Sequence, residues 1–456
     1  MLQTLFSRQP GIPSVPGANN WAFRPAIILL MACCLTEFCS SQDITPKERE
    51  QAQAMLKDTA KDVKTYYYDP HLHGLDWDAK VQQAKEKIDK ENSLNRALTD
   101  IAVVLGNLND SHTGFIPPPR PYKFDYGFQM LMIGDRCFVT RVRPGGDADS
   151  KGVKAGDQIF AVNGYKPTRE DFWRLEYLFW NLRPQPVLQL GLRGFDGAER
   201  QVNVTAKFHQ LPKVKDFYEM NYFNLEHEID EDERPLHIQY ASRDYNLLIV
   251  RLPAFMPVSN EVDAFDSKTE GYKAVLFDLR GDPGGSADMV QSLLGTLFDH
   301  KVKIGDLVGR GSTKPMETEH HFHKFNGKIA VLIDSKSASA AELFARVIQI
   351  EKRGVVIGDQ SSGMVMEAKM YLHRTDGSTA DSYLVYGAEV TVADIIMTDG
   401  QSLEKRGVVP DVVILPTPSD LASGRDPALA KAAELLNVQM SPEEAGKLFP
   451  YEWPKE

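Results

Sequence analysis

Four short apolar runs in the second half of the chain constrain its fold more than any other feature. They are bounded by turn residues, as buried strands are, and lie at residues 247–252, 274–278, 329–333 and 354–358. Two stretches of helical pattern, at 287–297 and 340–350, alternate with these runs. Alternation of this kind is typical of a layered α/β fold. We therefore expect an α/β core over residues 245–456, with a further helix near the C-terminus at 426–436.

The region before this core begins with a strong helix signal. Thr45 and Glu48 have the spacing of a capping box, and Pro46 occupies the first helical position. Apolar residues then recur at helical spacing, and two more helices are expected at 77–89 and 93–108. Residues 43–118 thus predict a helical cap domain.

Residues 122–207 have a different character. Short β-rich runs are separated by Gly, Asp and Pro turns, and one helix is expected near 169–180. The following residues, 208–244, are polar and irregular, and they indicate a linker with edge strands.

The N-terminal segment, residues 1–41, predicts export. Its apolar run, residues 26–35, is too short to span a bilayer, which needs ~20 residues, but it suits the central region of a signal peptide. The run contains Leu-Met-Ala-Cys ending at Cys33, which resembles a bacterial lipoprotein cleavage box. We expect a lipid on Cys33 and a place in the periplasm or on the outer membrane. The alternative is a plain signal peptide cut near Ser41, which gives a secreted protein.

Charge and cysteine content argue against a nucleic-acid-binding protein and against a fold that is stabilised by disulfides. The chain has 52 basic and 63 acidic residues without a basic block, which argues against nucleic acid as a partner. Three of its 4 cysteines lie near the N-terminal apolar run, and only Cys137 lies in the body of the chain, so no intramolecular disulfide framework is available.

Three segments carry the chemistry. The turn Asp-Pro-Gly-Gly ending at Gly285 leaves backbone N–H groups uncovered, as an oxyanion hole requires. Ser339 begins a helix, where free N–H donors surround a nucleophile. His112, in Leu-Asn-Asp-Ser-His-Thr, could supply the base. Each has an ordinary alternative: a strand-to-helix turn, an N-cap serine and a surface histidine.

In this order, the three segments resemble the signatures of the C-terminal processing (tail-specific) serine peptidases. The stretch Gly-Val-Val-Pro-Asp ending at Asp411 matches a fourth signature. The resemblance implies a crotonase-like α/β spiral core, polypeptide substrates with a free C-terminus, and no cofactor or metal. Residues 148–164 resemble a PDZ core, and the Tyr-Gly-Phe turn resembles its carboxylate-binding loop, which implies peptide binding by Tyr126, Gly127 and Phe128.

One position departs from the family's pattern. Most bacterial members use a Ser–Lys pair, but Met364 stands at the lysine position and Lys369 lies off the motif. The sequence is instead similar to the tricorn-like branch, in which a second serine precedes the histidine and a glutamate lies near the last signature.

This branch implies a role for each candidate residue. Ser339 attacks the scissile carbonyl, His112 takes its proton, Ser111 and Glu404 orient the imidazole, and the N–H groups of Gly285 and Ala340 form the oxyanion hole.

We therefore expect a serine endopeptidase of extracytoplasmic proteins or peptides, guided by a C-terminus held in the PDZ domain. Its base, His112, is expected to titrate not far from the ordinary histidine value of ~6.5, shifted by its surroundings. The alternative is a catalytically inactive peptide-binding homologue that acts as an envelope scaffold. The residues 320–323, His-His-Phe-His, have poor spacing for metal ligands and are interpreted as a strand or loop surface.

Overall fold

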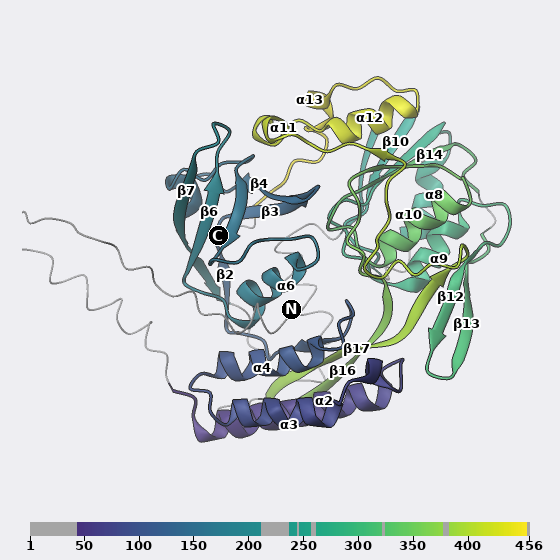
Figure 1. The fold of residues 1–456 in the computed structure, drawn as a ribbon. Helices are drawn as coiled ribbons and strands as arrows, with labels where there is room; N and C mark the ends of the chain where they lie inside the picture. The colour runs from purple at the N-terminus through teal and green to yellow at the C-terminus, as the bar shows by residue number, and fades with distance from the viewer. Residues whose placement is uncertain are drawn as a thin grey trace, which may run out of the picture.

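The computed structural model describes residues 43–210, 237–243, 246–256, 261–321, 324–376 and 383–453. The predicted signal and lipoprotein segment, with Cys33, lies outside the described residues, as does most of the predicted linker. Within the described part, no helix is both long and apolar enough to cross a membrane. The expected combination of an N-terminal helical region, a small β domain and an α/β core is confirmed (Figure 1).

The N-terminal helices lie where the sequence predicts them. Their bounds are α2 Pro46–Tyr66, the 3-10 turn η1 Leu72–Gly74, α3 Trp77–Ile88 and α4 Leu94–Gly106. The capping box at the start of α2 is formed, because Glu48 N–H donates to Thr45 Oγ1 (3.2 Å) and Thr45 N–H donates to Glu48 Oε2 (2.8 Å). The strand β1 (Gly114–Ile116) follows α4 but pairs with β17 of the core, so the turn between α4 and β1 is fixed at both ends.

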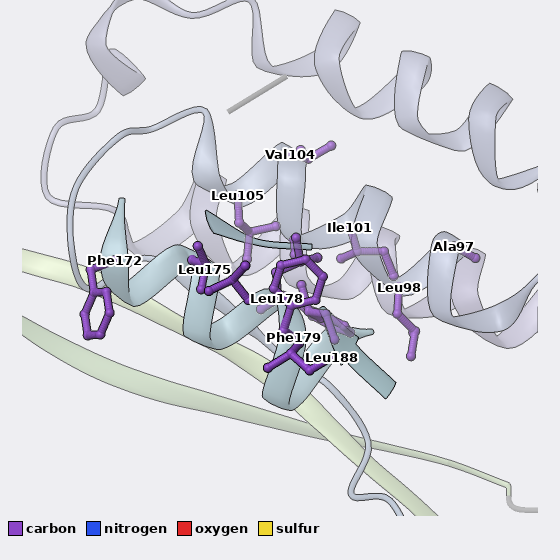
Figure 2. Packing of buried hydrophobic residues seen from close by; sticks show 14 of the residues in the cluster. Ala97, Leu98, Ile101, Val104, Leu105, Phe172, Leu175, Leu178, Phe179 and Leu188 are labelled. Atoms are coloured by element: carbon purple, nitrogen blue, oxygen red, sulfur yellow. The ribbon is translucent and has the colours of Figure 1, made fainter. Parts of the chain in front are cut away.

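The β domain is an antiparallel sheet with the strand order β3-β4-β5-β6-β7. Its strand β3 lies at an edge of the sheet, and β2 pairs with β8 beside it. Figure 2 shows its helical segment packed against α4, with Leu175, Leu178 and Phe179 facing Ile101 and Leu105. The elements are β2 Tyr122–Asp125, β3 Phe128–Ile133, β4 Arg136–Val142, α5 Asp147–Ser150, β5 Gln158–Val162, α6 Phe172–Glu176, the π-helical turn η2 Tyr177–Leu182, β6 Val187–Arg193, β7 Glu199–Thr205 and β8 Lys207–Gln210.

The core contains a six-stranded sheet of order β18-β15-β14-β11-β10-β9, parallel except for the antiparallel edge strand β9. Side chains on one face pack with α9 and α10, and those on the other face pack with α12. This double cover explains the continuous apolar strand sequences. The elements are β9 Gln239–Arg243, β10 Leu247–Arg251, α8 Glu261–Thr269, β11 Ala274–Asp278, α9 Ala287–Gly295, β14 Lys328–Ile333, α10 Ala340–Ile350, β15 Val355–Gly358, β18 Val412–Val413, α11 Pro418–Ser423, α12 Pro427–Leu435 and α13 Pro442–Ala445.

A second sheet of the core reaches the N-terminal helices. It comprises β1, β12 (Lys303–Gly309), β13 (Ser312–Glu317) and the long hairpin strands β16 (Met366–Asp376) and β17 (Tyr383–Met397). The hairpin runs beside α2 (Figure 1), where Tyr66 stacks on Tyr371 with ring centroids 4.2 Å apart and the Tyr386 hydroxyl donates to Asp58 Oδ2 (2.7 Å). The sequence did not predict these strands.

The C-terminal segment connects the core to the β domain. The guanidinium groups of Arg141 and Arg143 lie 4.8 Å and 4.9 Å from the ring centroids of Tyr451 and Trp453, respectively. These cation–π contacts place the segment against β4.

Candidate active site

Ser339 lies at the start of α10, directly after the loop that follows β14. Its backbone has φ 51° and ψ −116°, a conformation that residues with a Cβ rarely adopt. The conformation is fixed by its own N–H group, which donates to the Met364 carbonyl (2.8 Å) and to Glu342 Oε2 (3.0 Å). The first turn of α10 therefore presents a half-buried serine in a strained backbone, a conformation that is often found at functional sites.

The glycine turn after β11 packs directly on this serine. A Cβ at Gly284, where φ is +103°, would lie 2.6 Å from Ser339 Cβ and 2.9 Å from the Ala340 nitrogen. A Cβ at Gly285, where φ is +136°, would lie 2.2 Å from the Phe255 carbonyl oxygen. Both positions therefore require glycine. In the described part of the chain, neither Gly285 N–H nor Ala340 N–H donates a hydrogen bond, so both donors are available beside Ser339.

A buried carboxylate holds the main chain of Ser339. Glu342 is fully buried, and its two oxygens accept four hydrogen bonds. The donors are the Ser361 hydroxyl (2.5 Å), Gly363 N–H (2.8 Å), Met364 N–H (3.0 Å) and Ser339 N–H (3.0 Å). Glu342 thus joins Ser339 to the loop at residues 361–364. Burial raises the pKa of Glu342 to about 7, although its hydrogen bonds oppose that shift.

His112 belongs to a hydrogen-bonded row of three side chains. Ser111 Oγ lies 2.7 Å from His112 Nδ1 and 2.7 Å from Glu404 Oε2, and Ser111 N–H donates to Glu404 Oε1 (2.9 Å). The carboxylate can only accept, so the serine hydroxyl donates to it and accepts from Nδ1–H. This arrangement leaves the lone pair of His112 on Nε2, the state that a general base needs.

The protonation of His112 agrees with that role. Burial lowers the pKa of His112 to about 4, and the nearby Asp110 carboxylate opposes part of the change. The ring is therefore neutral at pH 7, and the value lies well below the ~6.5 expected from the sequence. Burial also raises the pKa of Glu404, against the effect of its hydrogen bonds with Ser111 and Val365.

One short segment links the two halves of the site. Met364 accepts the Ser339 N–H, and the next residue, Val365, donates its N–H to Glu404 Oε2 (3.1 Å). No hydrogen bond joins Ser339 to His112 among the described residues. Lys369 is exposed on β16, paired in register with Val390, and no hydrogen bond or ion pair joins it to Ser339 in the described structure.

The Tyr-Gly-Phe turn lies between β2 and β3. The Tyr126 side chain is buried and donates to the Gln185 carbonyl (2.7 Å), so its ring supports the turn. Gly127 has φ +70°, and its N–H donates to Asp125 Oδ1 (2.8 Å), while Asp125 Oδ2 pairs with Arg143 (2.7 Å). A carboxylate of the chain therefore already accepts from the N–H group that was expected to bind a peptide C-terminus.

Helix α6 of the β domain contacts the loops that precede His112 and Ser339. Arg174 donates to Asn109 Oδ1 (3.1 Å), three residues before His112, and Glu176 pairs with Lys336 (2.8 Å), three residues before Ser339. Ser335 also donates to the Met132 carbonyl on the edge strand β3 (2.6 Å). The β domain is thus attached directly to the loops that carry His112 and Ser339.

The sequence reasoning missed three polar residues that shape the site. Asp110 accepts the N–H groups of His112 (3.0 Å) and Thr113 (2.7 Å), and Glu342 and Ser361 hold the loop behind Ser339. Asp110 is part of the Leu-Asn-Asp-Ser-His-Thr motif, and Glu342 follows Ser339 by three residues, so the signal was present. Ser361 had no comparable signal.

No group of three or more His, Cys, Asp or Glu side chains suited to a metal ion is found among the described residues. His321 lies 3.0 Å from Ser292 Oγ, and His323 lies outside the described residues.

Two regions of the chain match known domain families. Residues 246–414 match the family model "Peptidase family S41", and residues 122–171 match "PDZ domain". The chain is 26% identical over 343 residues to the carboxy-terminal processing protease CtpA of Bacillus subtilis, a match that covers 72% of this chain and 65% of the relative. It is 24% identical over 412 residues to putative tricorn protease homolog 2 of Streptomyces coelicolor, covering 82% of this chain and 31% of that protein.

The chain therefore spans less than two thirds of these relatives' own length. Among solved structures, mature CPAF has a TM-score of 0.56 at 14% identity, with 81% of this chain and 94% of that chain covered. At this identity the likeness shows the fold.

Proposed function

The chain contains a peptidase family S41 domain and a PDZ domain, and from this premise we propose that it is a serine endopeptidase. The observation that carries the proposal is the row Glu404–Ser111–His112, with 2.7 Å between neighbouring side chains. A hydrogen bond from Val365 ties this row to the segment that holds Ser339. Met364 occupies the position of the lysine in the Ser–Lys pair. In this proposal, the tricorn-like row takes over the role of that lysine.

In the proposed reaction, Ser339 Oγ attacks the scissile carbonyl carbon while His112 Nε2 takes the hydroxyl proton. The carbonyl oxygen becomes an oxyanion that accepts from the N–H groups of Gly285 and Ala340. His112 then gives the proton to the leaving amine, the C–N bond breaks, and an acyl-enzyme remains. A water molecule, deprotonated by His112, releases the second product and restores Ser339.

The proposed substrates are polypeptides with a free C-terminus. The edge strand β3 can accept a peptide as an added strand, and the backbone of residues 126–128 would receive its carboxylate. Because Gly127 N–H donates to Asp125, the incoming carboxylate would replace that acceptor. Arg143, which pairs with Asp125, supplies a nearby positive charge.

We further propose an extracytoplasmic location, with a lipid on Cys33 as the anchor. The support is the Leu-Met-Ala-Cys box at the end of a short apolar run. Expression of the full chain in a bacterium followed by membrane fractionation tests this. Cys33→Ser should release the protein from the membrane fraction, and retention would contradict the anchor.

Covalent labelling of Ser339 tests the activity. A fluorophosphonate probe should label the purified full chain, and Ser339→Ala should abolish labelling. His112→Ala should abolish peptide cleavage nearly as completely, since nucleophile and base act as a unit. Lys369→Ala, an exposed substitution, is the matched control and should leave cleavage unchanged.

The departure at Met364 favours a second candidate, an inactive peptide-binding scaffold. The same experiment separates the two functions. A folded chain that binds peptides through its PDZ domain but neither labels nor cleaves would establish the scaffold and overturn the peptidase. Loss of cleavage in Lys369→Ala but not in His112→Ala would instead return the enzyme to a serine–lysine mechanism.

A further inference from the structure

A row of polar side chains leads from the surface of the N-terminal helices to the turn that carries His112. Asp69 Oδ2 lies 3.3 Å from His73 Nδ1, His73 Nε2 lies 2.9 Å from the Tyr67 hydroxyl, and that hydroxyl lies 2.8 Å from Asp110 Oδ2. Tyr67 is fully buried, whereas the His73 side chain is 43% exposed. Asp69, His73 and Tyr67 all lie outside the four sequence motifs.

The direction of each hydrogen bond follows from the groups involved. Asp110 can only accept, so Tyr67 donates its single hydroxyl hydrogen to Oδ2. The Tyr67 oxygen then accepts from His73 Nε2–H. The other oxygen of Asp110, Oδ1, accepts the N–H groups of His112 (3.0 Å) and Thr113 (2.7 Å). Tyr67 therefore holds the carboxylate from the side opposite to the catalytic turn.

Tyr67 has little freedom to move. Its N–H donates to the Val63 carbonyl at the end of α2 (3.0 Å), and its carbonyl accepts from Arg310 Nε in the β12–β13 hairpin (3.1 Å). Its neighbour Tyr68 donates its N–H to the Thr391 carbonyl on β17 (3.0 Å). The hydroxyl is thus placed by helix α2, by the turn of the β12–β13 hairpin and by strand β17 of the core.

The backbone around His73 is unusual in a way that fits this placement. Leu72 and His73 both have left-handed conformations, with φ 49° and 55°. Such conformations are rare outside glycine and are retained when surrounding contacts fix them. Asp69 provides those contacts, because its carboxylate accepts the N–H groups of His71 (2.9 Å) and His73 (2.7 Å). The strained turn brings the imidazole ring over Tyr67.

We propose that Tyr67, supported by His73, is a positioning residue for the catalytic turn. It fixes the Asp110 carboxylate and, through that carboxylate, the orientation of His112 relative to Ser339. The inference rests on the proposed peptidase function. It assigns a role in the reaction to a residue 45 positions before the histidine in the chain.

Tyr67→Phe tests the role, with Tyr386→Phe as the matched control. Tyr386 is similarly buried, belongs to β17 and donates to Asp58 on α2 (2.7 Å), but among the described residues no hydrogen bond joins its hydroxyl to the turn that carries His112. Both variants lose one tyrosine–carboxylate hydrogen bond, so both should lose similar thermal stability. Only Tyr67→Phe should slow fluorophosphonate labelling of Ser339, by about tenfold or more, and lower kcat with KM unchanged.

Two variants at His73 keep the proposal testable if Tyr67→Phe does not fold. His73→Gln keeps a donor toward the Tyr67 oxygen and should label faster than His73→Ala, which has none. Labelling of Tyr67→Phe at the wild-type rate would overturn the proposal, as would an equal loss in Tyr386→Phe. If the wild-type chain itself does not label, the proposed function fails, and that outcome is distinct from a failure of the Tyr67 role alone.

Discussion

Replacement of Glu342 by glutamine is the sharpest perturbation that the site offers. The amide has the shape of the protonated carboxylic acid, but it presents an NH2 group where the carboxylate presents an acceptor. On one side this group would face Gly363 N–H and the Ser361 hydroxyl, and on the other side Met364 N–H and Ser339 N–H. Either orientation leaves at least one buried N–H without an acceptor.

The expected change in stability is small because two effects oppose each other. An unsatisfied buried N–H costs about 1–3 kcal/mol. The ionised carboxylate of the wild type is itself unfavourable, since its pKa is raised from 4.5 to about 7, and this difference corresponds to about 3 kcal/mol. A raised acid pKa means that the folded state holds the proton more tightly, so this group's contribution to stability is present below pH 4.5 and is lost as pH rises toward 7. Glu342→Gln should therefore unfold at pH 8 within about 2 kcal/mol of the wild type.

Activity should change far more than stability. In one orientation of the amide, Ser339 N–H and Met364 N–H lose their shared acceptor, and in the other Gly363 N–H loses its acceptor. Each orientation disturbs the loop that holds Ser339, so we expect fluorophosphonate labelling to fall by about 10-fold or more, the effect of one charged hydrogen bond. Wild-type labelling should fall as pH drops through about 7, where Glu342 takes a proton. The variant, already neutral, should lack this step and lose its residual activity only near pH 4, where His112 is protonated.

The assay is the second-order labelling rate from pH 4 to 9, with urea unfolding of the same samples. A variant that labels like the wild type would refute the argument. So would a variant that keeps the step near pH 7.

Three further predictions concern the candidate active site and the peptide-binding region at 122–207. Gly284→Ala should abolish labelling in a folded protein, because the new Cβ would meet Ser339 Cβ at 2.6 Å; circular dichroism checks folding, and normal labelling would contradict the oxyanion geometry. His112→Ala should remain inactive at every pH from 5 to 9 in a peptide-cleavage assay, since the neutral ring is the base; recovery at high pH would point to an amine. A peptide acid should bind residues 122–207 more tightly than its C-terminal amide in calorimetry, and equal affinities would exclude carboxylate recognition by Gly127.

Much of the architecture could be predicted from local sequence pattern. The helices α3 and α4 begin within one residue of the expected positions, and the buried strands β10, β11, β14 and β15 were found from their apolar runs. These elements bury one stripe or both faces, so periodicity or a short apolar run marks them. The strands β16 and β17 were not predicted, because some of their residues that face the helices are polar and do not mark a buried strand. His373, for example, lies 2.6 Å from Asp62 Oδ2 on α2.

The individual residues of the candidate site could be predicted from the sequence, but the hydrogen bonds that join them could not. The sequence patterns indicated Ser339, His112 and Glu404. The structure links the side chains of His112 and Glu404 through Ser111, and it links the main chain of Ser339 to Glu404 through residues 364 and 365. The pKa of His112 could not be predicted, because it depends on burial created by the whole fold. Tyr67 lies outside every motif, and its hydrogen bond to Asp110 depends on the packing of α2 against the core.

The way in which Ser339 is held has a consequence for how enzymes of this kind can diverge. Met364 engages the site through its main chain, with its N–H on Glu342 and its carbonyl on Ser339 N–H. Any amino acid other than proline can make these two bonds. The side chain at position 364 therefore takes no part in these two hydrogen bonds. A lineage can exchange lysine for another residue there and keep the main-chain contacts that hold Ser339. Substitution at this one position can therefore remove an amine side chain while the main-chain hydrogen bonds that fix Ser339 stay in place.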